Sequence, residues 1–588
     1  MTANDSNPAT KPWYLPFLIL LSGMGGLLAG IDFGIIAGAL VYLDKTIPMT
    51  AAEQGFMVAI YTFGGIIAAL FAGALADLAG RKKMMLVGGL MFVASILLIF
   101  ISDTYYPLLI GRILMGLSGG VICVVVPLFM AECLPTAFRG RGTSAFQLLL
   151  TLGLVLATFV SKFFAGVHEK AVEAAAGNAD LIFKADQAAW KYIFLTACVP
   201  GALFCVLAVF ASESPRWLFR RNRESDAERI LRFSRTQAEA DIEIAEMRER
   251  AAAPSGTSNI ASSSGSLLQR KYIIPFVISC IVLACTQATG INTILPFGAK
   301  IIQGAGLSEK AAQDNLWLIT ATNCVVTLFG ALLVDRLGRK ILLSIGTAGI
   351  IVCLTVGGLM FYGFESKRVN VLPQVAKTLS PDGKSVSIKA DPSLAEIPMD
   401  GAGQLSVTYK WEKESKPKVV SAFSNAAKDE DRVLKIEPES EKKWVTVDGK
   451  KVEETRVKDA GKLELLRASY GPVAGKATGY GVLALLCAFI GFFAFGPGVC
   501  VWLALTELMP TRIRSTGMGI AMVLNNGVAF LSALFFPVVV GSQGFHMMFF
   551  IWAACTVVYF ITAAFIMPET KGKTLEEIED HFAGKPRA

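Results

Sequence analysis

One charged sequence pattern occurs twice in this chain, each time directly after a long apolar run. Residues 73–83 read GALADLAGRKK, and residues 330–340 read GALLVDRLGRK. A second pair follows in the same order, AECLPTAFRG at 131–140 and TELMPTRIRS at 506–515. The chain therefore consists of two halves with a common plan. Membrane proteins built from repeated halves are typically transporters that hold the substrate between the repeats.

Composition places both halves in a membrane. Only 17% of the residues are charged and the mean hydropathy is +0.54, whereas soluble proteins carry about 25% charged residues. Because a span needs roughly 20 apolar residues, we predict an all-α membrane protein of twelve spans in two six-helix bundles, surrounded by a lipid bilayer. The predicted spans lie near residues 15–43, 52–76, 83–102, 105–130, 142–165, 190–211, 272–299, 312–334, 341–364, 479–506, 516–540 and 545–567.

Basic residues in the short loops predict the orientation. The basic residues occur in six clusters, and all six fall on the cytoplasmic side of the membrane if both termini are cytoplasmic, as the positive-inside rule requires. We therefore expect a multi-pass protein of the cell (cytoplasmic or inner) membrane. The net charge of +8 is scattered over loops, which argues against a nucleic-acid partner. The clusters are Arg81–Lys83, Arg139 with Arg141, Arg216–Arg223, Arg336–Lys340, Arg512 with Arg514, and Lys571 with Lys573.

Cysteine and histidine give no sign of metal or cofactor chemistry. The eleven cysteines lie in or beside predicted spans without metal-ligand spacing. The three histidines, His168, His546 and His581, are far apart in the sequence. The spans also offer no pairing of a nucleophile with a base. We therefore expect no metal, no cofactor and no enzymatic activity.

Polar segments divide the chain into six parts. The expected order is an N-terminal six-helix bundle at 1–211, a cytoplasmic helical linker at 212–270, helices seven to nine at 271–364, an extracytoplasmic insertion at 365–478, helices ten to twelve at 479–567, and a cytoplasmic tail at 568–588.

The insertion at 365–478 carries two hairpin signals. Asp448-Gly449 and Asp382-Gly383 each stand between runs that favour strands. We predict a small β-rich module on the external side. It is either a docking or substrate-capturing lid with an unknown partner, or a loop insertion tolerated because lengthening a loop costs little.

Two ionisable residues lie deep inside predicted spans. With a rise of about 1.5 Å per residue, Asp32 lies roughly 16 Å and Arg112 roughly 10 Å below the outer ends of their spans. They could therefore meet inside the first bundle. A buried carboxylate keeps its charge beside an arginine and takes a proton when that partner moves away. This pair is the candidate for proton coupling, and a static ion pair between two helices is the alternative.

The second half carries amides in place of charges. Amides both donate and accept hydrogen bonds, which suits a neutral ligand covered in hydroxyl groups. Trp502 adds an apolar face for a sugar ring. Each amide alone could instead join two helices, but together they favour a site for a neutral sugar or polyol. The amides are Gln287, Asn292, Asn323, Asn525 and Asn526, with Gln147 from the first half.

Seven motifs, one of which occurs twice, resemble the sugar porter family of the major facilitator superfamily, over about 470 residues of the two bundles. They are GGLLAGIDFGIIAGAL, the two loop motifs GALADLAGRKK and GALLVDRLGRK, PLFMAECLPTAFRG, SESPRWL, TGIN, GPGVCVW and the terminal PETKGKTLEEI. The resemblance implies the major facilitator fold and alternating access. It implies sugar contacts at Gln147, Gln287, Asn292, Asn323, Trp502 and Asn525, and a proton-coupling pair at Asp32 and Arg112 as in bacterial symporters of the family.

Several positions depart from the family pattern. Thr286 replaces the first Gln of Q-Q-x-x-G-x-N, and Asn526 stands where Trp is common; both remain candidate contacts. Pro296 and Phe297 replace a tyrosine pair, so the identity of the sugar does not transfer from the family. Leu78 replaces the basic residue beside Asp77 in the first loop motif.

A further set of charges is expected at the cytoplasmic helix ends. Exposed ion pairs contribute about 0–1 kcal/mol each, so only a network of them would hold the inner side closed; topology signalling is the alternative. The candidates are Asp77, Arg81, Glu132, Arg139, Glu213 and Arg216 in one half, and Asp335, Arg336, Arg339, Glu507, Arg512 and Glu569 in the other.

Together these patterns predict a secondary transporter that imports a neutral monosaccharide or polyol with protons. A facilitative uniporter and a sugar sensor on a transporter scaffold are the alternatives.

Overall fold

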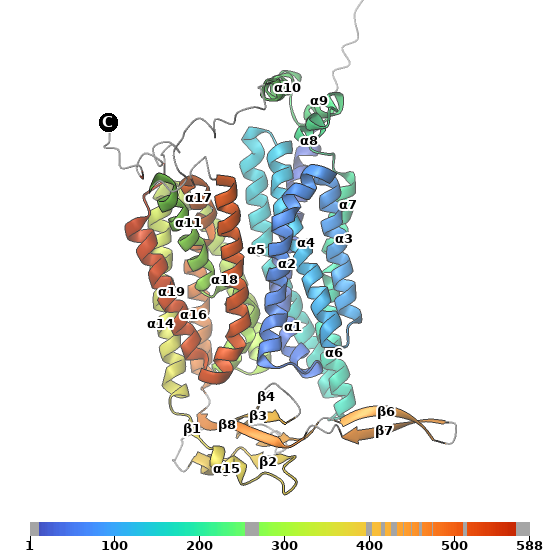
Figure 1. Ribbon diagram of the computed structural model, residues 1–588, viewed down its shortest axis with the longest axis vertical. Helices are drawn as coiled ribbons and strands as arrows, with labels where there is room; N and C mark the ends of the chain where they lie inside the picture. The colour runs from blue at the N-terminus through green and yellow to red at the C-terminus, as the bar shows by residue number, and fades with distance from the viewer. Residues whose placement is uncertain are drawn as a thin grey trace, which may run out of the picture.

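A computed structural model describes most of the chain and shows two helical bundles side by side (Figure 1). The described residues are 11–252, 270–395, 403–412, 418–424, 432–438, 440–447, 450–457, 461–472, 474–509, 514–571 and 582. They contain twelve helices or helix pairs long and apolar enough to cross a membrane. The predicted all-α membrane fold with twelve spans is thus confirmed.

The first half spans the membrane six times and is followed by short linker helices. Its sixth span is made of two consecutive helices. The elements are α1 Tyr14–Thr46, α2 Ala51–Ala79, α3 Arg81–Ile101, α4 Tyr105–Cys133, α5 Thr136–Ala174, α6 Ala179–Thr196 and α7 Cys198–Phe210, then α8 Pro215–Arg220, α9 Glu224–Ser234 and α10 Gln237–Ala252 in the linker.

The second half repeats the plan with two broken spans, the seventh and the tenth. The elements are α11 Arg270–Ala288 with α12 Ile291–Gly304, α13 Glu309–Leu337, α14 Arg339–Glu365, α16 Lys476–Phe495 with α17 Pro497–Leu508, α18 Arg514–Gln543, and α19 Phe545–Ile561, which continues in the π-helical turn Thr562–Ile566.

Large apolar side chains remain exposed on the outward faces of the bundles. Phe71, Phe163, Val199 and Phe565 are examples, each more than half exposed. A soluble protein rarely leaves such a continuous apolar surface in water. The surface is explained by contact with lipid tails.

A glycine breaks the seventh span in its middle. Gly290 lies between α11 and α12 with φ +87°, a left-handed conformation that favours glycine. A Cβ atom here would lie 2.4 Å from the ring of Trp552 on α19. The break turns the backbone beside Asn292, the first polar residue of α12. Discontinuous spans of this kind are typical of substrate sites in transporters.

The two halves contact each other in the part of the spans near the insertion. Lys300 of α12 pairs with Asp44 of α1, and Lys310 of α13 lies 2.7 Å from Glu169 of α5. The amide of Gln313 donates to the carbonyl of Gly38 at 3.2 Å. Nearer the middle, the hydroxyl groups of Thr158 and Thr320 lie 2.8 Å apart, and Thr151 lies 3.5 Å from the sulfur of Cys324.

The insertion folds as small β-sheets at the end of the bundles opposite the linker helices (Figure 1). Three antiparallel groups form, with strand orders β1-β8-β3-β4, β2-β5 and β6-β7. Fifteen buried residues, among them Trp411 and Tyr470, give it a core of its own. The predicted β-rich module is therefore present. Its elements are β1 Val369–Asn370, α15 Leu372–Ala376, β2 Val386–Lys389, a 3₁₀ turn Pro392–Ala395, β3 Gly403–Trp411, β4 Lys418–Phe423, β5 Val433–Ile436, β6 Ser440–Val447, β7 Lys450–Val457 and β8 Leu463–Pro472.

The two hairpin signals have different outcomes. Val447 pairs with Lys450, so β6 and β7 form the expected hairpin with a two-residue connection, although residues 448–449 themselves lie outside the described residues. At the other signal, Gly383 makes a turn with φ +66° and Leu379 bridges Val386. The chain before that turn is helical, and β2 pairs with β5. The second prediction was therefore right for the turn and wrong for the strand pairing.

We expect Gly290→Ala to destabilise the fold by about 2–4 kcal/mol, since a left-handed non-glycine residue costs about 1–2 kcal/mol and overpacking adds about 1–3 kcal/mol. The unfolding temperature in detergent would measure the loss. Gly166→Ala in α5 is the matched control, because a Cβ atom there meets nothing within 4 Å. Equal unfolding temperatures for the two variants would contradict this account of the break.

Candidate functional site

Asp32 of α1 and Arg112 of α4 both lie inside the first bundle, and each is 1% exposed. No direct ion pair joins these two described side chains; Tyr61 of α2 lies between them. Its hydroxyl donates to Oδ2 of Asp32 at 3.4 Å, and the guanidinium carbon of Arg112 lies 5.2 Å from the centroid of its ring. The expected meeting of acid and base is thus mediated by a tyrosine. This three-residue arrangement is the acid cluster of the site.

The acid cluster leaves polar atoms without partners. Oδ1 of Asp32 and Nε of Arg112 are buried and make no hydrogen bond within the described part of the chain. A buried polar group in this condition costs about 1–3 kcal/mol, and more when it is charged. Among the described residues, the guanidinium hydrogen-bonds only to the sulfur of Met115, at 3.5 Å. Oδ1 of Asp32 is therefore available to hold a proton.

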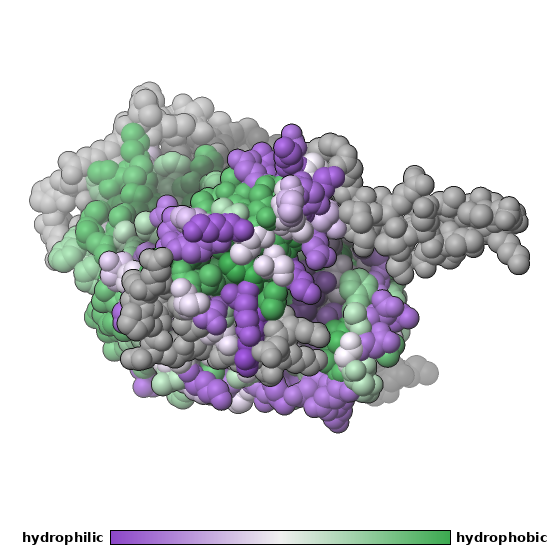
Figure 2. All heavy atoms as spheres, turned by 90° about the horizontal axis from the view of Figure 1, so that it is seen from below, coloured by the Kyte–Doolittle hydropathy of each residue, from purple (hydrophilic) through white to green (hydrophobic). Residues whose placement is uncertain are grey.

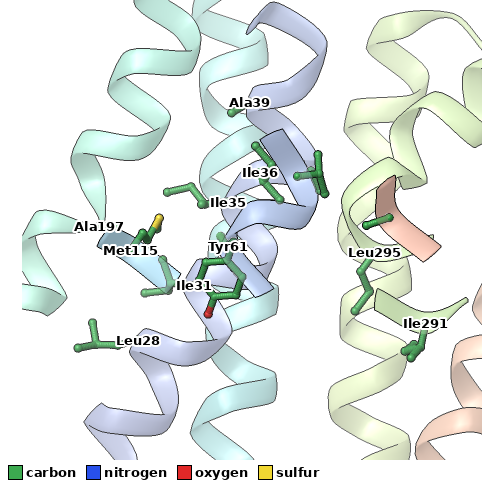
Figure 3. Packing of buried hydrophobic residues seen from close by; sticks show 14 of the residues in the cluster. Leu28, Ile31, Ile35, Ile36, Ala39, Tyr61, Met115, Ala197, Ile291 and Leu295 are labelled. Atoms are coloured by element: carbon green, nitrogen blue, oxygen red, sulfur yellow. The ribbon is translucent and has the colours of Figure 1, made fainter. Parts of the chain in front are cut away.

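Sequence reasoning missed Tyr61. It lies among Ile31, Ile35 and Met115 in the apolar core (Figure 3). Its only distinguishing signal in the sequence is a phenolic hydroxyl in the middle of an apolar span. A buried tyrosine hydroxyl usually finds a hydrogen-bond partner, so that signal could have marked α2 as a third wall of the site.

A narrow cavity of about 10 Å³, the room that one water molecule needs, adjoins the acid cluster. Both halves of the protein line it. Asn292 and Pro296 of α12 and Ala533 of α18 face Asp32 and Tyr61 across it. The candidate proton site and one candidate sugar contact therefore share a cavity. The remaining lining residues are Phe33, Ile36, Val58, Thr62 and Arg112.

Four predicted amides form one hydrogen-bonded chain over three helices. Asn292 of α12 donates to Oε1 of Gln287 on α11 at 2.7 Å. Gln287 donates to Oδ1 of Asn525 on α18 at 3.1 Å, and Asn525 donates to Oδ1 of Asn526 at 3.2 Å. The break at Gly290 lets α11 and α12 contribute to the same chain. We call these four residues the amide chain.

The other predicted sugar contacts lie apart from the amide chain. Asn323 of α13 accepts from Thr327 on its own helix at 3.3 Å, and Gln147 of α5 is exposed. The hydroxyl of Thr286 donates to Tyr559 at 3.0 Å and is 3% exposed. Thr286 therefore faces α19, whereas Gln287 faces Asn292 and Asn525, because adjacent residues of a helix point in different directions. Trp502 lies in α17, but its side chain is outside the described structure.

The charged residues at the linker end of the first half form a cluster around the buried pair of Arg81 and Glu132. Arg81, 2% exposed, reaches Oδ1 of Asp77 at 2.7 Å and both oxygens of Glu132 at 2.8 and 2.9 Å. Ser214 of the linker donates to Glu132 at 2.5 Å. Glu213 accepts the backbone N–H of Arg81 at 2.9 Å and so caps α3. A carboxylate at a helix N-terminus is favourable for the helix dipole.

The second half repeats this arrangement with fewer contacts. Arg339 donates to Oε1 of Glu507 at 3.0 Å, and Glu569 accepts the backbone N–H groups of Arg339 and Lys340 at 3.1 Å each. Gly80 and Gly338, with φ +100° and +91°, precede the two capped helices. The repeat in the sequence thus corresponds to a repeated cap.

The described ion pairs at the linker end each lie within one half, so in this conformation they do not join the bundles. Arg216 makes no hydrogen bond or ion pair within the described residues, and Arg336 is exposed. The side chains of Arg139 and Asp335 are not described, and Arg512 lies outside the described residues.

Comparison with known proteins identifies the family. The family described as "Sugar (and other) transporter" matches residues 18–379 and 464–582. The chain belongs to the sugar porter family of the major facilitator superfamily. The match stops within the insertion, at residue 379, and resumes at residue 464.

Relatives cover nearly all of the chain. The glucose transporter GlcP of Staphylococcus epidermidis is 26% identical over 96% of both chains. The human proton myo-inositol cotransporter is also 26% identical, over 97% of this chain and 82% of its own. The inward-open xylose transporter XylE from E. coli superposes with a TM-score of 0.64 at 19% identity, over 97% of this chain and 100% of its own. These relatives are transporters and not enzymes, and this chain is a multi-pass membrane protein of their family.

We expect Arg81→Gln to destabilise the protein by about 3–5 kcal/mol, because it leaves Glu132 buried without its counter-charge. Arg339→Gln is the matched variant in the other half. It should cost less, since the side chains of Arg339 and Glu507 are 12% and 25% exposed, against 2% and 6% for Arg81 and Glu132. Unfolding temperatures in detergent would rank the two variants, and the reverse order would contradict the assignment.

Proposed function

We propose that this protein imports a neutral monosaccharide or polyol together with a proton, by alternating access of its two bundles. The observation that carries the proposal is the cavity lined by Asp32 and Tyr61 from one half and by Asn292 from the other. A proton held at Asp32 and a sugar held at the amide chain would thus act on the same interface. Coupled transport needs such a junction, because each ligand must bias the same movement of the halves.

The geometry of the acid cluster supports Asp32 as the residue that carries the proton. Tyr61 donates to Oδ2 of Asp32, so Oδ1 would receive the proton. Protonation removes a charge from an apolar interior, where an unsolvated charge is costly. The guanidinium of Arg112 remains over the tyrosine ring. When α1, α2 and α4 shift relative to one another, a closer Arg112 would favour the ionised carboxylate and release the proton.

The amide chain suits a ligand with hydroxyl groups. In the amide chain each residue donates one hydrogen bond to the next, from Asn292 through to Asn526. Oδ1 of Asn292 and Nδ2 of Asn526, at the two ends, therefore remain for a ligand. A hydroxyl group both donates and accepts and can pair with either end. The described residues of the chain that line the proton cavity include no cation besides Arg112. An uncharged sugar or polyol is therefore favoured over an anion.

The conformation also supports alternating access. The described polar contacts between the halves lie from the middle of the spans to the insertion end, beginning with Lys300 and Asp44. If the linker and both termini are cytoplasmic, as the loop charges predict, this is an inward-facing state of a cell-membrane importer. The human relative is named a proton myo-inositol cotransporter, which is consistent with a proton-coupled polyol substrate.

We expect Asp32→Asn to abolish uphill, pH-driven accumulation of sugar while sparing exchange of sugar across the membrane. An asparagine keeps the shape of the side chain but does not take up the proton. Uptake into proteoliposomes with an imposed pH gradient would measure the accumulation, and counterflow of labelled sugar would measure the exchange. Asp103→Asn, which removes an exposed acid near the insertion end, is the control and should behave like the wild type. Continued accumulation by Asp32→Asn would exclude this coupling role.

Gln287→Ala should weaken sugar binding by about 1–3 kcal/mol, since it removes two hydrogen bonds and leaves Nδ2 of Asn292 and Oδ1 of Asn525 without these partners. Thr286→Val is the neighbouring control. Its hydroxyl faces Tyr559, so the affinity for sugar should change little. Titration calorimetry with a panel of monosaccharides and polyols would give both values. An unchanged affinity in Gln287→Ala would remove the amide chain from the sugar site.

A further inference from the structure

A polar cavity of about 320 Å³ lies between the insertion and the end of the second bundle. Seen from the insertion end, hydrophilic side chains gather on this face beside apolar ones (Figure 2). The cavity is separate from the acid cluster and from the amide chain. Its lining residues are Gly304, Glu365, Arg368, Asn370, Gln404, Ser406, Thr408, Arg467, Ala468, Ser469, Val540, Gly541, Ser542, Gln543, Gly544 and Phe545.

Two arginines in this lining make no ion pair within the described part of the chain. Arg368 follows α14 and donates through Nη2 to Oε1 of Gln404 on β3 at 3.1 Å. Its Nε is buried and has no hydrogen-bond partner. Arg467 of β8 is exposed and donates through Nη1 to the backbone carbonyl of Ser542 at the end of α18. Both guanidinium groups are thus held in place by neutral acceptors.

The carboxylate in the cavity lining is already engaged. Both oxygens of Glu365 accept the backbone N–H groups of Phe545 and His546, at 2.9 and 3.1 Å, and so cap α19. One of them also lies 2.6 Å from Nδ1 of His546. Glu365 therefore does not neutralise the arginines by direct contact.

The electrostatic surroundings of Arg368 agree with an excess of positive charge. Burial lowers the pKa of Arg368 below its ordinary value, Glu365 opposes that change, and the nearby charge of Arg467 reinforces it. Two like charges held close together, one of them mostly buried, are stabilised by an anion placed between them.

We propose that this cavity binds a phosphate-type oxyanion, held by Arg368 and Arg467. Arginine is suited to this ligand because its planar fork of N–H groups matches the oxygens of a phosphate. Asn370, Ser469 and Thr408 supply neutral donors around the same space. The bound anion would join the insertion to the second bundle, since the two arginines already contact β3 and α18.

Such an oxyanion has two sources, free phosphate in solution and the headgroup of an anionic lipid. The cavity lies where α14 and α18 end and α19 begins, close in the chain to the half-exposed Tyr362 of α14. Aromatic residues at this level are typical of the interface between membrane and water. The site would bind an oxyanion from either source through the same contacts, so an experiment has to distinguish the two sources.

The first experiment uses full-length protein purified in neutral detergent and titrated with inorganic phosphate, with chloride at matched ionic strength as the salt control. The second uses the same protein in nanodiscs of phosphatidylcholine with and without phosphatidylglycerol. In each, the unfolding temperature reports binding, since a ligand stabilises the state that it binds. A saturable rise with phosphate identifies the free anion, and a rise only with phosphatidylglycerol identifies the headgroup.

The variants test whether the arginines hold the anion. Arg467→Gln and Arg368→Gln should each weaken the binding by about tenfold or more, because a hydrogen bond to a charged group contributes about 1.5–3 kcal/mol. Arg467→Lys should retain part of it. Lys435→Gln, which removes an exposed charge from β5, should bind like the wild type. The exposed position of Arg467 keeps the test valid if Arg368→Gln fails to fold.

The proposal is overturned if neither phosphate nor phosphatidylglycerol raises the unfolding temperature. It is equally overturned if either does so to the same extent in Arg467→Gln as in Lys435→Gln. Sugar transport by the same variants is measured separately. The result for anion binding therefore does not depend on the proposed transport activity.

Discussion

A charge inside a membrane span lacks water to solvate it, and the first bundle is arranged around that constraint. In an apolar interior, Asp32 and Arg112 each need a polar or charged partner. Tyr61 satisfies them partly, with its hydroxyl on the carboxylate and its ring under the guanidinium. Partial satisfaction of this kind suits the proton site that we propose at Asp32. A buried carboxylate that is fully paired with a cation would stay ionised, and an isolated one would stay protonated.

The same interior brings residues of the two halves together. The break at Gly290 brings Asn292 to the cavity beside Asp32, while the rest of the amide chain stays in the second bundle. A shift between the bundles therefore changes the surroundings of the acid and of the amides together. The repeated caps at Glu213 and Glu569 hold each linker-end loop within its own bundle. If the bundles rock as proposed, these caps would keep the loops of each bundle intact.

Much of the fold was predictable because membrane spans obey a simple rule. Backbone polar groups must be satisfied within each helix in lipid, so long apolar runs specify helices without tertiary information. The charged positions were visible for the same reason, since Asp32 and Arg112 stand out against apolar neighbours.

Side-chain direction was not predictable in this way. Thr286 and Gln287 are adjacent, yet one faces Tyr559 and the other Asn525, and only the packed helices decide which. Tyr61 was missed because a tyrosine is ordinary in an apolar span until its hydroxyl is found beside Asp32. The strand pairing of β2 with β5 was equally hidden, since it joins residues about fifty positions apart.

The insertion shows how an addition can change a transporter without disturbing its bundles. Its own core lets it fold at the loop between α14 and α16, and both of its ends belong to the second half. Tyr409 and Val420 also line a cavity of about 550 Å³ whose other walls include Pro48 and Gln54 of the first half. An element anchored in one bundle and facing the other must change its contacts when the bundles separate at this end. Under the alternating access that we propose, the insertion would therefore be mechanically linked to the opening of the bundles at this end.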